Sequence, residues 1–192
     1  MVDFLYKNFL RTFQLLFLRV GLSGKNYQNF KDLNFKQNDF INYKIIKHYV
    51  VKDNFINNVN ILDAHTFNFL FFYQKLGGKI GIELSKKNIF LWFKKFKYNK
   101  KFLWDTIYAS KRFINLVYSY DFICSISNEK EIAQINKILN FHIKRITFEL
   151  GLKKIDSISS NEILALVLIE CCKNSLDTKI NKKIDNFINI QI

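Results

Sequence analysis

From residue 63 to the end of the chain, apolar residues recur at steps of three and four positions, and this periodicity is what most constrains the fold. Clusters of Gly, Asn, Ser and Lys divide the periodic sequence into blocks, each several helical turns long. Steps of three and four place apolar side chains on one face of an α-helix. We therefore predict helices over residues 63–76, 81–96, 103–120, 128–151, 159–172 and 179–190.

Three of the predicted helix boundaries carry specific signals. Gly77 and Gly78 follow the first periodic block, and glycine ends helices because it adopts the left-handed conformation without a steric penalty. Asn128 and Ser159 each precede a glutamate by three residues, at Glu131 and Glu162. This is the capping-box spacing, in which the two side chains satisfy free backbone N–H groups, so helices are expected to begin there.

Short connections between helices of this length make sequential neighbours antiparallel. The prediction is an all-α protein whose residues 63–192 form stacked antiparallel helical hairpins, arranged as part of an α/α toroid. A helix-pair solenoid buries its hairpins in the same way and stays open as an alternative. No motif recurs at a fixed period, which disfavours the common solenoid families.

The N-terminal segment, residues 1–20, is predicted to form an amphipathic helix. Lys7, Arg11, Gln14 and Arg19 interrupt its apolar runs, so no transmembrane helix or signal peptide is visible, and the compartment stays unassigned. We expect this helix to dock on its own domain rather than on a membrane. Residues 21–62, rich in Asn and with short β-favouring runs, are predicted to be an irregular lead-in.

The chain has 30 basic and 16 acidic residues, a net charge of +14 that points towards a polyanionic partner. However, 26 of the cations are Lys and only 4 are Arg, proline is absent, and Ile, Asn and Phe are abundant. Lys, Ile, Asn and Phe have A/T-rich codons, so their abundance reflects codon composition. We therefore interpret most lysines as part of a solvated surface. Because the lysines spread along the whole chain, without a focused patch, no nucleic-acid partner is predicted.

Standard catalytic and metal-binding signatures are absent from the sequence: there is no Gly-rich phosphate loop, His-Glu-x-x-His, Gly-x-Ser-x-Gly or Cys-x-x-Cys. The three cysteines, Cys124, Cys171 and Cys172, have spacings that suit neither a disulfide framework nor a zinc site. The three histidines lie far apart in the sequence. Neither a cofactor nor a metal is predicted.

Two of these histidines have informative positions. His142 falls on the apolar stripe of the predicted helix 128–151, in register with Leu139 and Ile146, and is expected to be a hydrogen-bonded core histidine. His65 falls in the first turn of its predicted helix. There it can hydrogen-bond a neighbouring loop or face a cleft, and both interpretations stay open.

The most suggestive set is Trp104, Tyr108, Arg112 and Asn115, which lie at i, i+4, i+8 and i+11 and so on one face of a helix. Aromatic rings stack on sugars, and arginine binds carboxylate or sulfate with two parallel hydrogen bonds. The set therefore fits a sugar or carboxylate surface. The alternative is an aromatic packing face with one arginine reaching solvent. Arg112 is notable as an arginine in a chain whose cations are mostly lysine.

With these residues in view, the stretch from Asp63 to Cys172 resembles the N-terminal helical region of the heparinase II/III-like polysaccharide lyases, alphaproteobacterial type. The family's His-x-Phe-x-Trp-Leu start is matched by His65, Phe67, Phe69 in place of Trp, and Leu70, followed by Gly77 and Gly78. Its later elements are matched by the following segments: Leu91-Trp92-Phe93, Trp104, Lys111 to Leu116 with Leu116 in place of Trp, Gln134 to Leu150, and Ile163 to Cys172.

The resemblance implies an α/α toroid that binds an acidic polysaccharide, which the full family cleaves by β-elimination. The family's catalytic Asn, Tyr and His lie in later helices and a β-rich domain, so no catalytic residue is assigned here. We expect a chain that is inactive alone and needs a C-terminal lyase portion or a second chain. The predicted substrate-binding residues are His65, Trp104, Tyr108, Arg112 and Asn115. The alternative function is a non-enzymatic helical interaction or membrane-surface protein.

Overall fold

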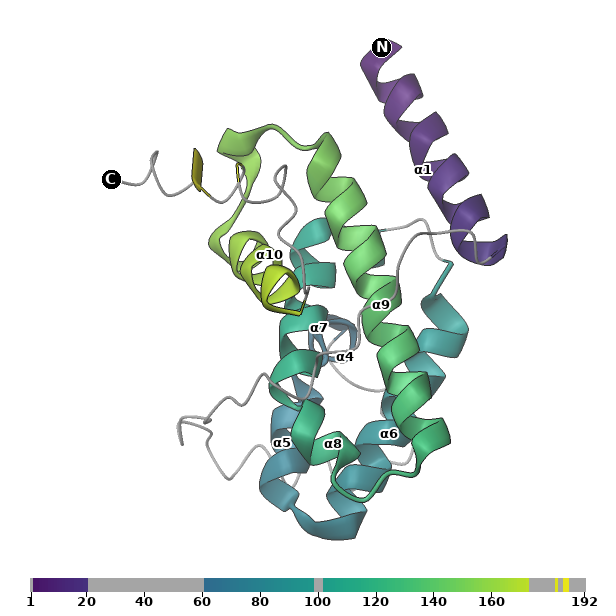
Figure 1. Ribbon diagram of the computed structural model, residues 1–192, viewed down its shortest axis with the longest axis vertical. Helices are drawn as coiled ribbons and strands as arrows, with labels where there is room; N and C mark the ends of the chain where they lie inside the picture. Colours follow the sequence, from purple (N-terminus) through teal and green to yellow (C-terminus); the bar gives the residue numbers. More distant parts are fainter. Residues whose placement is uncertain (1, 21–60, 99–101, 173–181, 183–184, 187–192) are drawn as a thin grey trace.

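The computed structural model describes residues 2–20, 61–98, 102–172, 182 and 185–186, and all regular secondary structure in them is helical (Figure 1). The all-α class is thereby confirmed. The helices are α1 (Val2–Val20), α4 (Ile61–Thr66), α5 (Phe69–Leu76), α6 (Gly78–Phe96), α7 (Thr106–Tyr118), α8 (Tyr120–Cys124), α9 (Glu129–Leu152) and α10 (Ser160–Cys171), with 3₁₀ turns η1 (Phe102–Trp104) and η2 (Ile155–Ser157). The predicted lead-in lies outside the described residues, except that residues 61 and 62 begin α4. Most of the predicted helix 179–190 lies outside them too.

Both predicted capping boxes are present. The Asn128 side chain accepts a hydrogen bond from the backbone N–H of Glu131 at 3.0 Å, and the Glu131 carboxylate accepts one from the backbone N–H of Asn128 at 3.0 Å. At the start of α10, the Glu162 carboxylate accepts from the backbone N–H of Ser159 at 2.7 Å. These contacts satisfy N–H groups that have no partner inside the helix, which explains why α9 and α10 begin there.

The prediction of one helix over residues 63–76 is wrong, because the chain breaks between α4 and α5. Phe67 has a φ of 63°, in the left-handed region that a bulky residue rarely occupies. Its side chain is fully buried, and its ring centroid lies 5.2 Å from that of Trp92. Burial of the ring stabilises a strained backbone. The three-and-four spacing of apolar residues continues through the break, so periodicity could not reveal it.

The predicted helix 103–120 is also divided, into η1, α7 and the start of α8. Asp105 caps α7, since its side chain accepts from the backbone N–H of Ile107 at 3.2 Å. Trp104 consequently lies in η1, before α7, and does not share a continuous helix with Tyr108 and Arg112. Ser119 separates α7 from α8.

Helix α7 lies at the centre of the core and contacts α4, α5, α9 and α10 (Figure 1). Its apolar side chains Phe113, Leu116 and Val117 are almost completely buried, whereas Ile107 in the first turn is 40% exposed. Helices α5 and α6 form a tight pair joined through Gly77, whose φ of 70° suits glycine. Burial of these faces supplies the main driving force for the fold.

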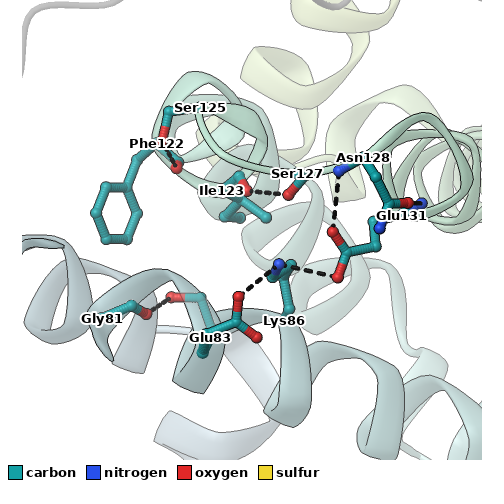
Figure 2. A network of polar contacts seen from close by, with 10 residues as sticks. Gly81, Glu83, Lys86, Phe122, Ile123, Ser125, Ser127, Asn128 and Glu131 are labelled. Carbon is teal, nitrogen blue, oxygen red and sulfur yellow. Dashed lines mark hydrogen bonds and ion pairs between the residues drawn. The ribbon is translucent and has the colours of Figure 1, made fainter. Parts of the chain in front are cut away.

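A buried lysine connects α6 to the start of α9 (Figure 2). The Lys86 ammonium lies 2.9 Å from a carboxylate oxygen of Glu83 and 2.9 Å from one of Glu131, and the lysine side chain is only 4% exposed. Burial lowers the pKa of Lys86, but the two carboxylates outweigh this effect and the net pKa is raised. Glu131 thus serves both as the capping residue of α9 and as a partner of Lys86.

Helix α1 lies against α9 along one side of the molecule (Figure 1). The Arg11 guanidinium Nε donates to both carboxylate oxygens of Glu149, at 2.9 and 3.0 Å. Gln14 donates to the carbonyl of Lys144 at 2.8 Å, and Leu15 and Leu18 are buried. Polar contacts and two leucines therefore fix α1 on the body of the protein.

Candidate functional site

The Arg112 guanidinium lies in the interior, close to the rings of two tryptophans. Its carbon is 4.3 Å from the ring centroid of Trp92 and 4.7 Å from that of Trp104. Its two terminal nitrogens donate to the carbonyls of His65, at 2.6 Å, and of Leu103, at 2.7 Å. The residue is fully buried. Its charge is thus stabilised by carbonyl dipoles and aromatic faces.

The third acceptor for Arg112 is His142. Arg112 Nε donates to His142 Nε2 at 3.2 Å, and His142 Nδ1 lies 2.9 Å from the carbonyl of Ile138. These contacts assign the ring proton to Nδ1, because Nε2 must accept. Burial, followed by the nearby positive charge of Arg112, lowers the pKa of His142 well below its usual value, so the ring stays neutral. The prediction of a hydrogen-bonded core histidine is confirmed.

Arg112 and Asn115 together satisfy the carbonyls that the break between α4 and α5 leaves without helical partners. The Asn115 amide donates to the carbonyl of Thr66 at 2.8 Å and to the Asn68 side chain at 2.9 Å, while Arg112 binds the carbonyl of His65. Unsatisfied buried carbonyls are costly. These two α7 side chains therefore act as internal caps of the break.

His65 and Tyr108 are both half-buried. His65 Nδ1 accepts from the indole N–H of Trp92 at 2.8 Å. Burial, followed by the positive charges of Arg112 and Lys95, lowers the pKa of His65 to about 4. Its ring is therefore neutral at physiological pH, and Nδ1 already has a donor.

The structure thus brings His65, Trp104 and Arg112 into one cluster, but as part of the interior. Trp104, Arg112 and Asn115 are at most 7% exposed, and a ligand could bind their polar groups only by displacing the internal contacts. Ligand binding by these residues and by Tyr108 stays a prediction. The geometry favours the alternative that α7 presents a packing face, but its arginine does not reach solvent, because Arg112 is fully buried and bonded to backbone carbonyls.

A cleft of about 600 Å³ opens between α1, η1 and α9. Its walls come from segments that are far apart in the sequence. They consist of Lys7, Asn8, Arg11, Thr12 and Leu15 of α1, Trp104, Asp105 and Thr106 around η1, and Arg145, Glu149, Leu152, Lys153, Lys154 and Ser157 from α9 to η2. Trp104 is the only one of the five predicted site residues among them.

The cleft is electropositive, since five basic and two acidic side chains line it. The Arg145 guanidinium lies over the Trp104 ring, 4.5 Å from its centroid. Burial lowers the pKa of Arg145 to about 10, so the residue is charged at neutral pH. Lys153 pairs with the buried Glu162 at 2.7 Å, and Lys154 is exposed. The excess of positive charge and the fixed guanidinium suit an anionic ligand.

Sequence reasoning missed the cleft because α1 and α9 are separated by most of the chain. One signal was available, namely the four arginines in a lysine-rich sequence. Arg11 binds Glu149 through one nitrogen, and Arg19, Arg112 and Arg145 each lie over an aromatic ring. A guanidinium can lie over a ring and donate hydrogen bonds at the same time, as that of Arg112 does, which an ammonium group does less well. Arg11 and Arg145 stand out among the lysines for the same reason as Arg112.

The side chains that line the cleft include no histidine, tyrosine or cysteine. Throughout residues 2–20, 61–98 and 102–172, no group of three or more His, Cys, Asp or Glu side chains is placed to hold a metal ion. The three cysteines are free thiols. What the cleft offers chemically is binding of carboxylate, sulfate or phosphate groups.

None of the helices in the described part of the chain is both long and apolar enough to cross a membrane. Comparison of the chain with protein-family models, with curated proteins and with solved structures finds no match.

Proposed function

We propose that this protein is a helical domain of the heparinase II/III type that binds an acidic polysaccharide in the cleft between α1, η1 and α9. The observation that carries the proposal is the excess of basic side chains around Trp104 in a cleft large enough for sugar units. The ordered resemblance from His65 to Cys172 adds the substrate class. In this proposal the substrate binds to residues that line the cleft and not to the buried face of α7.

The chemistry of the cleft suits binding better than catalysis. Arg145, held over Trp104, and the lysines of both walls pair with uronate carboxylates or sulfate groups. β-Elimination also requires a base for the C5 proton and an acid for the leaving oxygen. Histidine and tyrosine, which serve these roles in such lyases, do not line the cleft. We therefore assign catalysis to a C-terminal lyase portion or a second chain.

The toroid is proposed as the finer arrangement of the helices. Its support is the succession of packed neighbours, in which α5 contacts α6, α7 contacts α9, and α9 contacts α10. Helix α10 also contacts α7, so α7, α9 and α10 pack together.

The test is isothermal titration calorimetry of the full chain with three oligosaccharides of equal length: a polygalacturonate, a heparin fragment and neutral maltodextrin. We expect binding of at least one acidic oligosaccharide and none of maltodextrin. The double variant Lys7→Glu/Lys154→Glu reverses two cations of the cleft and is expected to weaken binding about tenfold or more, since loss of roughly 1.4 kcal/mol corresponds to a factor of ten.

The matched control is Lys79→Glu/Lys130→Glu, which changes the net charge equally at exposed positions of α6 and α9 that do not line the cleft. We expect the control to bind almost as the wild type does. Equal weakening in both variants, or no binding of either acidic oligosaccharide, contradicts the proposal. An increase in absorbance from unsaturated uronate product with the chain alone contradicts the assignment of catalysis elsewhere.

A further inference from the structure

The face of α1 that points away from α9 is apolar. It carries six exposed apolar or aromatic side chains, here called the outer stripe: Leu5, Tyr6, Phe9, Phe13, Leu16 and Phe17. Phe9 is 64% exposed and Phe13 is 49% exposed. The rings form a ladder, with centroids 6.1 Å apart between Phe9 and Phe13 and 4.7 Å apart between Phe13 and Phe17. Soluble surface helices normally have the reverse arrangement, with the apolar face inward.

The docking contacts fix this orientation. Arg11 and Gln14 point towards α9, where they bind Glu149 and the carbonyl of Lys144. At 100° per residue, Arg11, Leu15 and Leu18 occupy one side of the helix, and Phe9, Phe13 and Leu16 occupy the opposite side. The outer stripe extends over about three helical turns and contains no charged residue.

A basic rim adjoins the C-terminal end of the outer stripe. The Arg19 guanidinium carbon and the Lys97 ammonium nitrogen both lie 4.8 Å from the centroid of the Tyr98 ring. Arg19 is exposed and lies on α1 itself. An apolar helical face bordered by cations, on a protein with a net charge of +14, complements a surface that is apolar within and negatively charged at its boundary.

We propose that the outer stripe of α1 binds the surface of an anionic lipid bilayer, with the helix in the plane of the interface and Arg19 and Lys97 contacting lipid phosphates. This function is separate from the cleft, because the stripe and the cleft residues Lys7 and Arg11 lie on opposite sides of α1. Phenylalanine and leucine enter the acyl boundary of such interfaces, and tyrosine favours the headgroup level.

The test is co-sedimentation of the full chain with vesicles of phosphatidylcholine alone and of phosphatidylcholine with phosphatidylglycerol. We expect sedimentation with the anionic vesicles, reduced by added salt. The variant Phe9→Ser/Phe13→Ser is expected to lower the bound fraction about tenfold or more, because the free energy gained by transferring two phenylalanine rings from water into the bilayer is lost. The control, Ile80→Ser/Leu91→Ser, removes two exposed apolar side chains of α6 and is expected to bind as the wild type does.

Circular dichroism checks that both variants remain folded, and analytical ultracentrifugation follows self-association. The proposal is overturned if the wild type does not sediment with anionic vesicles. It is also overturned if Phe9→Ser/Phe13→Ser binds these vesicles as well as the control Ile80→Ser/Leu91→Ser does. A monomer–dimer equilibrium that Phe9→Ser/Phe13→Ser abolishes, without lipid binding by the wild type, assigns the stripe to a second copy of the chain and also overturns it. The Lys7→Glu/Lys154→Glu variant separates the two sites, since it is expected to bind the oligosaccharide about tenfold or more weakly while still sedimenting with anionic vesicles.

Discussion

Replacement of Arg112 by leucine is expected to lower the free energy of unfolding by about 2–4 kcal/mol. The substitution leaves the carbonyls of His65 and Leu103 buried without their donor, and it removes the donor to His142. Relief from burying a charge offsets part of this loss. Urea unfolding followed by circular dichroism measures the effect, and a loss of this size is a large share of the stability of an ordinary domain.

The neighbouring Lys111 provides the control, because it is exposed on the same helix. Lys111→Leu is expected to change the free energy of unfolding by less than about 0.5 kcal/mol. Arg112→Lys should fall near Arg112→Leu, since one ammonium group cannot reproduce the spread donors of the guanidinium. If Arg112→Leu is as stable as the wild type, the guanidinium is not the internal cap that its contacts indicate.

The second large effect is expected at Gly81, in the tight pair of α5 and α6. A Cβ atom built at this position lies 2.3 Å from the carbonyl oxygen of Tyr73 and 3.2 Å from the Phe122 ring. The first neighbour is backbone, so α5 and α6 must separate to accept a methyl group. We expect Gly81→Ala to lower the free energy of unfolding by about 1–3 kcal/mol, although alanine is the better helix former.

Gly151 is the matched control, because it lies in α9 and a Cβ there has no atom within 4 Å. Gly151→Ala is expected to raise the free energy of unfolding by up to about 1 kcal/mol through helix propensity. The two substitutions should therefore have opposite signs in thermal or urea unfolding. If Gly81→Ala also stabilises the protein, α5 and α6 do not approach each other as closely as the structure shows.

The sequence predicts helix ends well where a capping side chain or a glycine defines the end. The capping pairs at Asn128 and Ser159 and the glycines after Leu76 act within a few residues, so sequence alone reveals them. The break at Phe67 could not be predicted in this way. It depends on burial of the Phe67 ring and on donors from α7, which lies far along the chain.

The candidate site shows the same limit. The sequence pattern predicts a sugar or carboxylate surface at Trp104, Arg112 and Asn115, but sequence cannot distinguish a guanidinium that binds a ligand from one that binds backbone carbonyls. Their buried partners, the carbonyls of His65, Thr66 and Leu103, appear only in the folded chain. The cleft requires α1 to lie against α9, a contact between residues separated by 130 or more positions in the sequence.

The most direct test of binding in the cleft uses the chain's two tryptophans, whose ring centroids lie 5.7 Å apart and of which only Trp104 lines the cleft. Trp104 lines the cleft, whereas the indole N–H of the fully buried Trp92 donates to His65. In ¹H–¹⁵N spectra, the two indole signals are followed during titration with the acidic oligosaccharide. The account predicts a saturable shift of the Trp104 signal and an unchanged Trp92 signal. A shift of the Trp92 signal alone, or of neither signal, would contradict it.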